Sequence, residues 1–406
     1  MINNITPTDT KQRYVILDFL RGIALLGICL ANFPEFALYT FQKKEVVEAM
    51  PTADIDHVVK FFQYVFIDGK FYTIFSLLFG IGFSIIITSY SQKSENGLSL
   101  FYRRMIILVL IGLFHLVFLW AGDILILYAI VGLLLPLFKN VPDKKLLTVS
   151  VILLLVPILI DTLIATFGWN LATPVIKATR YFHEMVGITE DNFPVWLVEG
   201  QSYWDIVKFN LGGSFIRMQE FIDGNRIFKV LGLFLLGLYI GRNKIYTNLN
   251  ENKPLLKKVC FWGFIIGLPT SFLYAWDAVS GHPLGMTGSA TAYAVSVVPL
   301  GFAYISAICL WYIKNTERKI FKILAAPGRV ALTNYIGQSV FGIIIFYGIG
   351  LELGAKVGLV YVELIAAGVF LTQVCLSNIW LHYFRFGPLE WIWRMLTYGK
   401  WLKLSK

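Results

Sequence analysis

Two ionisable residues stand inside an apolar stretch of the chain, and they are the first candidates for chemistry. Residues 111–132 read IGLFHLVFLWAGDILILYAIVG, so His115 and Asp123 are each flanked by apolar or small side chains. A carboxylate can orient an imidazole, which then acts as a general base. If the chain turns tightly at Gly122, Asp123 can fold back towards His115. Two alternatives stay open: His115 as a hydrogen-bonded packing residue, and Asp123 as the N-cap of a following helix.

A polar stripe is predicted on the first apolar segment, LDFLRGIALLGICLANF. Arg21 and Asn32 are eleven residues apart, three helical turns plus about 20°, so both side chains share one face. Asp18 precedes Arg21 by three residues and can pair with it. An ionisable side chain at membrane depth costs about 2.5–3.5 kcal/mol on insertion scales, so it faces a partner, a bundle interior or a water-filled cavity. Arg21 and Asn32 are therefore candidate binding residues.

Two further apolar segments carry candidate binding residues. Lys70 lies in DGKFYTIFSLLFGIGFS, where it is either a binding group or a lysine that extends to the outer headgroups. Asn334 and Gln338 are four residues apart in PGRVALTNYIGQSVFG and share a helical face. Hydrogen bonds between helices would explain both amides without any chemistry, and this alternative stays open.

The elements that must position these residues are membrane-spanning helices. The chain has 406 residues, of which 57% are hydrophobic and 15% charged, against roughly 25% charged residues in soluble proteins. Several apolar runs are about 20 residues long, which suffices to cross a hydrocarbon core of about 30 Å as a helix. We therefore predict an all-α fold, a polytopic membrane helical bundle of about ten spans. These lie near residues 15–38, 62–90, 105–121, 124–138, 146–167, 227–241, 259–277, 288–313, 330–350 and 357–383.

The distribution of basic residues predicts the orientation of this bundle. Lysine and arginine concentrate in alternate connections, and such connections stay in the cytoplasm. Both termini are therefore expected to be cytoplasmic. The net charge of +10 then lies near anionic headgroups, so membrane lipids are the expected partner and a nucleic acid is not.

Residues 1–406 are expected to form a single integral membrane domain with two accessory segments. Residues 168–225 are too aromatic for a disordered linker and are predicted to be an extracytoplasmic helical loop or lid. Residues 384–406 mix tryptophan with basic residues, which is typical of a cytoplasmic interfacial amphipathic segment. Small residues at 348–358 make a homodimer possible.

Several enzyme classes lack a supporting motif. The chain contains no GxxxxGK[ST], GxSxG or HExxH pattern, and no histidine or cysteine pair at ligand spacing. The four cysteines each lie in an apolar run, as small buried hydrophobic residues do. ATP hydrolysis, serine hydrolysis and a metal centre are therefore not predicted.

Five sequence blocks carry a resemblance to a known family. They are LDFLRGIALLGICLANF, GKFYTIFSLLFGIGFS, GLFHLVFLWAGDILILYAIVGLLL, GRVALTNYIGQSVFGIIIFYGIGL and FRFGPLEWIWRMLTYGK. In this order and spacing they resemble the YeiB family of bacterial membrane proteins over essentially the whole chain. The C-terminal part is similar to that family's domain of unknown function. The resemblance implies a multi-pass protein of the bacterial plasma membrane.

A second resemblance concerns a reaction. The RG pair at 21–22 followed by Asn32, and GDIL at 122–125, are similar to blocks of heparan-alpha-glucosaminide N-acetyltransferase and related transmembrane acyltransferases. This implies transfer of an acetyl or similar acyl group from cytoplasmic acyl-CoA, such as acetyl-CoA, to an extracytoplasmic sugar or cell-envelope acceptor. That acetyltransferase has a histidine before its second span, where this chain has His57, so the resemblance leaves the identity of the base open.

These expectations combine into one mechanism. Arg21 would bind the phosphates of the acyl donor, because arginine forms paired hydrogen bonds with phosphate oxygens. His115, oriented by Asp123, would act as base on the acceptor. Asn32 or Gln338 would stabilise the developing oxyanion, and no covalent enzyme intermediate is required. The alternative is a secondary transporter or proton-coupled permease that uses the same polar groups.

Overall fold

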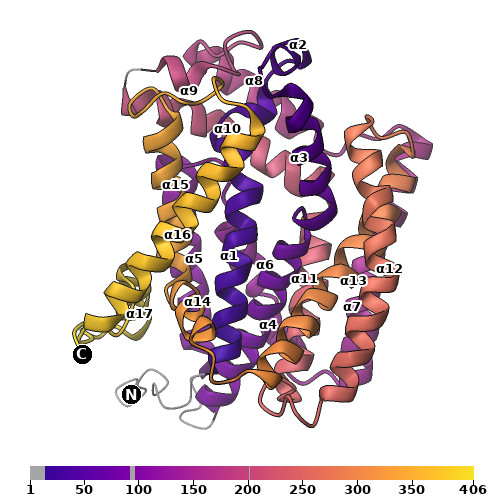
Figure 1. Cartoon of the computed structure of the whole chain (residues 1–406), viewed down its shortest axis with the longest axis vertical. Helices are drawn as coiled ribbons and strands as arrows, with labels where there is room; N and C mark the ends of the chain where they lie inside the picture. Colours follow the sequence, from indigo (N-terminus) through magenta and orange to yellow (C-terminus); the bar gives the residue numbers. More distant parts are fainter. Residues whose placement is uncertain (1–13, 92–96, 201) are drawn as a thin grey trace.

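The computed structural model describes residues 14–91, 97–200 and 202–406, and this part of the chain is a bundle of helices (Figure 1). Seven of the described helical segments are long and apolar enough to cross a membrane, and there are eight when one bent helix pair is counted as a span. The predicted class, an all-α membrane bundle, is confirmed. The predicted number of ten spans is not.

The spanning segments follow the apolar runs of the sequence. They are α1 (Val15–Phe36), α3 and α4 together (Ala53–Phe66 and Lys70–Ser91), α5 (Gly97–Phe118), α7 (Asp143–Phe167), α12 (Lys253–Val279), α13 (Gly285–Lys314) and α16 (Leu359–Tyr383). The bent pair is α14 (Lys319–Arg329) and α15 (Ala331–Phe346), which meet at 75°. The outer face of α7 exposes Val151, Leu155 and Leu159, apolar groups that belong in lipid.

Two predicted spans are shorter than the membrane core. Residues 124–138 form α6 (Leu125–Gly132) and a 3-10 turn, η3 (Leu135–Phe138), and 227–241 form α11 (Arg226–Arg242). At 1.5 Å per residue, α6 covers about 12 Å and α11 about 25 Å, against about 30 Å of hydrocarbon. Both helices are held inside the bundle, where α6 packs on α5 and α11 packs on α4 and α7.

One end of the bundle is covered by the long connection. Residues 168–225, of which Gln201 lies outside the described residues, hold α8 (Thr173–Val186), α9 (Trp196–Glu199) and α10 (Tyr203–Asp223). Figure 1 shows them at the top, beside η2 (Tyr39–Phe41) and α2 (Lys44–Glu48), and we call this the loop end. Residues 348–358 form a turn here, and the Gly348 amide donates to the Leu197 carbonyl at 2.8 Å. This segment is therefore not the helix face that suggested a homodimer.

The opposite end is where α1 and α5 begin, and we call it the basic end. The C-terminal helix α17 (Pro388–Tyr398) lies at this end too (Figure 1). The Trp393 indole donates to the Arg104 carbonyl at 2.9 Å, and the Trp391 indole donates to the Leu402 carbonyl at 2.7 Å. Part of segment 384–406 thus packs against α5 and α15. That this end faces the cytoplasm stays a prediction from the charge pattern.

Candidate functional site

The chain reverses direction between α5 and α6, and this turn brings Asp123 against His115. Asp123 Oδ2 lies 2.8 Å from His115 Nδ1, and the side chains of both residues are fully buried. A Cβ atom on Gly112 would lie 2.8 Å from Ile126, so glycine at 112 lets the returning segment approach α5 closely. The predicted contact between the two residues is therefore present in the fold.

Asp123 is also held by its neighbours. Its second oxygen, Oδ1, accepts the Ile126 amide at 2.9 Å and so binds the first turn of α6, although the N-cap position itself is Ile124 and not Asp123. From α10, the Arg217 guanidinium donates to the backbone carbonyl of Asp123 at 2.9 Å and to that of Gly122. Hydrogen bonds therefore hold Asp123 at both carboxylate oxygens and at its backbone carbonyl.

A third residue, Ser339 of α15, completes the arrangement. Its Oγ lies 2.8 Å from His115 Nε2, and the serine is 1% exposed. An Asp123 carboxylate can only accept a hydrogen bond, so Nδ1 carries the imidazole proton and Nε2 accepts a hydrogen bond from the Ser339 hydroxyl. An acid, a histidine and a serine linked in this order form the geometry of nucleophilic catalysis. We call His115, Asp123 and Ser339 the central triad.

Sequence reasoning missed Ser339. No GxSxG motif surrounds it, and it lies 224 residues from His115, so only the tertiary fold brings the two side chains together. Serine is also common in membrane helices, where it hydrogen-bonds to the preceding turn of its own helix. No local signal in the sequence therefore points to it.

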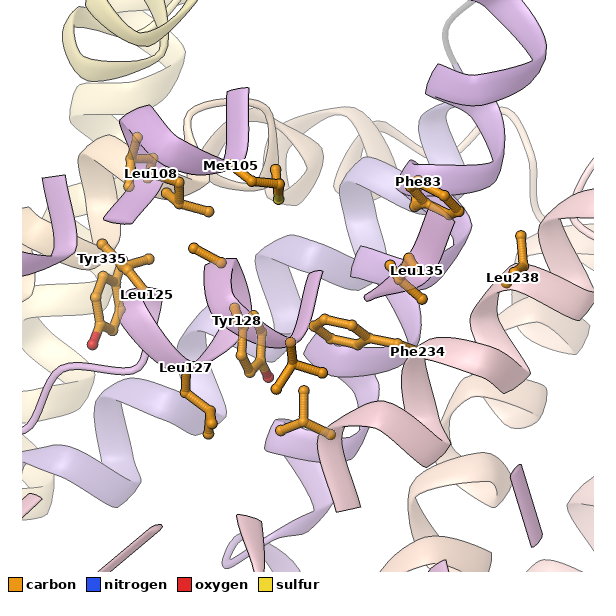
Figure 2. Close-up of a cluster of buried hydrophobic side chains, with 14 of the residues drawn as sticks. Phe83, Met105, Leu108, Leu125, Leu127, Tyr128, Leu135, Phe234, Leu238 and Tyr335 are labelled. Carbon is orange, nitrogen blue, oxygen red and sulfur yellow. The ribbon is translucent and has the colours of Figure 1, made fainter. Parts of the chain in front are cut away.

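A cavity of about 340 Å³ opens at the basic end. The charged side chains that line it are Asp18, Arg21, Arg104, Arg329, Glu390 and Arg394. Figure 2 shows part of its apolar wall, with Met105 and Leu108 of α5 and Leu125 and Tyr128 of α6. We call this the basic-end cavity. It has the character of a site for an anionic amphiphile, cationic at one end and apolar further in.

The inner wall of this cavity is formed by neighbours of the central triad, while the three triad residues themselves do not line it. Ile124 and Tyr335 line the cavity, and the Ile124 amide donates to Tyr335 Oη at 3.2 Å. The Tyr335 and His115 rings are 5.2 Å apart between centroids. Tyr335 (labelled in Figure 2) thus contacts both the cavity and the triad histidine.

A second, smaller pocket of about 40 Å³ lies on the other side of the triad, at the loop end. It is lined by Glu35, Arg217 and Glu220, and by aromatic side chains that include Trp120 and Tyr347. The Trp120 ring lies 6.4 Å from the His115 ring, and Gly122, next to Asp123, lines the pocket as well. We call this the loop-end pocket. The central triad therefore stands between two pockets that enter from opposite ends of the bundle.

The charged mouth of the basic-end cavity includes Glu390 of α17. Its carboxylate accepts the Leu332 and Thr333 amides at 2.7 and 3.1 Å and the Thr333 hydroxyl at 2.6 Å, and so caps the start of α15. Burial raises the pKa of Glu390, while the hydrogen bonds from Thr333 and Leu332 oppose that rise. A half-buried carboxylate thus joins the C-terminal helix to the helix that carries Ser339.

The predicted binding residues separate into two groups. Arg21 lines the basic-end cavity and pairs with Asp18 at 2.9 Å, as predicted. Asn32 is half-buried and lines neither pocket, so the stripe from Arg21 does not continue along the cavity as far as Asn32. Lys70 does not extend to the headgroups. It is fully buried and donates to the Tyr64 carbonyl at 2.6 Å.

The two predicted amides of α15 hold helices together. Asn334 Nδ2 donates to Ser377 Oγ at 2.9 Å and to the Pro327 carbonyl at 3.2 Å. Gln338 Nε2 donates to Gln373 Oε1 at 3.2 Å and to the Leu25 carbonyl at 3.3 Å. Neither residue lines either pocket. Both instead form hydrogen bonds between helices, which was the alternative to a binding role. His57, the other candidate base, is exposed.

Comparison with known proteins supports the resemblance noted in the sequence. Residues 240–400 match a family described as "Protein of unknown function (DUF418)". The chain is 28% identical over 422 residues to "Uncharacterized protein YxaH" of Bacillus subtilis (strain 168), covering 100% of this chain and 99% of the relative. It is 27% identical over 413 residues to "Uncharacterized protein YeiB" of Escherichia coli (strain K12), covering 95% and 96%.

No solved structure matches the chain. The two relatives extend over nearly the whole chain, and so over the helices that carry the basic-end cavity and the central triad. The family match covers only the C-terminal part, in which Ser339 lies. The resemblance noted in five sequence blocks is confirmed. This membrane protein is similar to YeiB and YxaH over nearly its whole length, and its C-terminal part matches DUF418.

Proposed function

We propose that this protein is an acyltransferase of the bacterial plasma membrane, which moves an acetyl or similar acyl group from acyl-CoA to an acceptor on the other side. One observation carries the proposal. A cavity with arginines at its basic end and apolar walls further in reaches Tyr335, which contacts the histidine of the central triad. A second pocket approaches the same histidine from the loop end.

The basic-end cavity suits the chemistry of an acyl-CoA donor. Arginine pairs with phosphate oxygens through two hydrogen bonds, and four arginines line this cavity: Arg21, Arg104, Arg329 and Arg394. A volume of about 340 Å³ falls at the lower end of ligand pockets, which measure about 300–1,000 Å³. It suits the pantetheine arm and the acyl group, with the nucleotide left at the charged mouth. The positive-inside rule puts this mouth in the cytoplasm.

The central triad supplies the catalytic base. Asp123 holds His115 in the tautomer whose Nε2 accepts a proton, so the histidine can receive a proton from an attacking hydroxyl or amine. Gln338 and Asn32, the amides expected to stabilise the oxyanion, are not placed to do so. Gln338 Nε2 already donates to the Leu25 carbonyl and to Gln373, and Asn32 lines neither pocket. Tyr335 takes this role in the proposal. Its Oη accepts from the Ile124 amide and has its own proton to donate.

The loop-end pocket would receive only the reacting end of the acceptor. About 40 Å³ is room for a few heavy atoms, since one water needs about 10–15 Å³. Its carboxylates, Glu35 and Glu220, can accept hydrogen bonds from hydroxyl or ammonium groups, and Trp120 offers an aromatic face. Both features suit a sugar or another polyol of the cell envelope.

Binding of acetyl-CoA to the purified protein in lipid nanodiscs tests the proposal. Wild type should bind, and Arg104→Ala should bind roughly tenfold or more weakly, the loss expected for a charge-assisted phosphate contact. Arg103→Ala is the matched control, because the neighbouring Arg103 is exposed and does not line the cavity. His115→Ala should bind like wild type.

Two results would count against the acyltransferase. Absence of acetyl-CoA binding by wild-type protein contradicts it directly. Equal losses in Arg103→Ala and Arg104→Ala would mean that the net charge of the basic end, not the cavity, attracts the nucleotide. If acetyl-CoA does not bind and the protein in vesicles moves a solute that His115→Ala cannot move, the permease is the better description.

A further inference from the structure

The central triad contains a group that direct transfer does not use. General-base catalysis on an acceptor requires His115 and Asp123 alone, yet His115 Nε2 is occupied by Ser339 Oγ at 2.8 Å. An acceptor would have to displace this serine to reach the base. In contrast, a serine hydrogen-bonded to a histidine, which is in turn oriented by a carboxylate, is the arrangement that activates an oxygen nucleophile.

The position of Ser339 on α15 also relates it to both pockets. Leu332 and Tyr335 line the basic-end cavity, and Ser339 follows them at positions i+7 and i+4, which lie on the same helical face. Just beyond the end of α15, Tyr347 lines the loop-end pocket. This helix thus runs from one pocket to the other, and Ser339 lies between its two pocket-lining parts.

We propose that Ser339 is a covalent acyl carrier, so that transfer occurs in two steps through an acyl-serine. The inference rests on the proposed function and specifies its chemistry. It also accounts for the two separate pockets. With a covalent carrier, donor and acceptor need not occupy the protein together, and the acyl group alone passes between them.

In the first step, Ser339 Oγ attacks the thioester carbonyl of the bound donor. The serine proton passes to His115 Nε2, the carbon–sulfur bond breaks, and an oxygen ester forms on Ser339. The imidazolium, stabilised by Asp123, returns the proton to the departing thiolate, so that free coenzyme A leaves as the thiol.

In the second step, a hydroxyl or amine of the acceptor enters from the loop-end pocket and attacks the ester. His115 accepts its proton, the bond between the acyl carbon and Ser339 Oγ breaks, and the imidazolium reprotonates the serine. No oxidant, metal or further co-reactant is needed, and the central triad returns to its starting state.

Acyl exchange tests this step without knowledge of the acceptor. A protein that forms an acyl-serine exchanges isotope-labelled coenzyme A into unlabelled acetyl-CoA when no acceptor is present, whereas direct transfer cannot. Wild type should show exchange, and acid quenching followed by peptide mass spectrometry should find one acetyl group on Ser339. Ser339→Ala should bind acetyl-CoA normally and lose exchange by at least about 10³-fold.

Two variants separate catalysis from folding. Ser296→Ala is the matched control, because Ser296 of α13 is fully buried but hydrogen-bonds to the Tyr293 carbonyl of its own helix. It should keep exchange. Ser339→Cys keeps a nucleophile and should restore part of the exchange as a thioester, which a packing role would not predict.

The outcomes distinguish this inference from the function on which it rests. Acetyl-CoA binding without exchange or label in wild type, or label on another residue, overturns the acyl-serine and leaves direct transfer standing. Exchange that persists in Ser339→Ala overturns it as well. If wild type does not bind acetyl-CoA at all, the acyltransferase itself fails.

Discussion

Two polar clusters of the bundle differ in their surroundings: one adjoins pockets and the other does not. In the central triad, His115 and Asp123 stand between the basic-end cavity and the loop-end pocket. In the second cluster, Tyr274 donates to Asp68 at 2.6 Å, and Lys70 donates to the Tyr64 carbonyl and lies 5.1 Å from the Tyr274 ring. Neither Asp68 nor Lys70 lines either pocket.

The difference teaches what burial of charge means in this protein. Both clusters contain ionisable side chains inside apolar segments, so the cost of insertion applies to both. Lys70 and Asp68 recover that cost through contacts between helices. His115 and Asp123 make comparable contacts, but Tyr335 and Trp120 connect them to space that a ligand can enter. Adjacency to a cavity, not membrane depth, separates a candidate site from a structural cluster.

The largest effect should come from Asp123→Asn. An amide can donate to Nδ1, which leaves the proton on Nε2 and removes the base, so exchange between coenzyme A and acetyl-CoA should fall by about 10³- to 10⁴-fold. Asp68→Asn is the counterpart in the other cluster and should leave the exchange rate nearly unchanged. A comparable loss in Asp68→Asn would erase the contrast between the clusters.

Tyr335→Phe should have the next largest effect. It keeps the ring against His115 and removes the hydroxyl proposed to stabilise the oxyanion, so turnover should fall by about 10²- to 10³-fold with unchanged acetyl-CoA binding. Tyr274→Phe removes a buried hydroxyl from the second cluster and is the control. If binding and turnover fall together in Tyr335→Phe, the hydroxyl shapes the cavity and does not act on the reaction.

Glu390→Gln should lower the free energy of unfolding by about 1 kcal/mol, because it removes the hydrogen bond that the carboxylate accepts from the Thr333 hydroxyl. Burial raises the pKa of Glu390 in the folded protein, so the folded state binds the proton more tightly than the unfolded state. The stabilisation is complete below the ordinary pKa and is lost as the pH rises through the folded value. The melting temperature of wild type, followed from about pH 4 to about pH 7, should therefore fall relative to that of Glu390→Gln. A parallel pH dependence in both proteins would remove Glu390 as its cause.

The smallest effect is expected from Lys70→Met. Methionine fills a similar volume without a charge, and replacement of a buried charge by a well-packed apolar group is often neutral or stabilising. Exchange should match wild type, and the melting temperature should stay the same or rise. Loss of exchange with an intact fold would bring Lys70 back as a functional residue and would mean that the second cluster also serves the reaction.

Much of the fold was predictable because membrane burial imposes a long apolar run on each span. The predicted span 146–167 corresponds to α7, which begins three residues earlier, and the predicted span 357–383 corresponds to α16, which begins two residues later. The predicted spans were not confirmed where a helix is sheltered by others and need not match the thickness of the bilayer. The eight residues of α6 are too few to cross the hydrocarbon core, yet they are as apolar as the residues of a membrane-spanning helix.

The candidate site was predictable only in its local part. His115 and Asp123 are eight residues apart, and the glycine between them made the fold-back a reasonable expectation. For Asn334 and Gln338, the sequence showed a shared face but not what that face touches. Their partners, Ser377 and Gln373, come from α16 and leave them as contacts between helices.

Composition and local pattern determined that this chain enters a membrane as helices, which end is basic, and that a histidine and an aspartate meet at one turn. These properties depend on neighbouring residues and on the solvent, so the order of residues suffices to establish them. Tertiary structure alone decided that Ser339 completes the central triad and that pockets approach it from both ends. Cavities are the spaces left by helices distant in sequence, and no single segment encodes them.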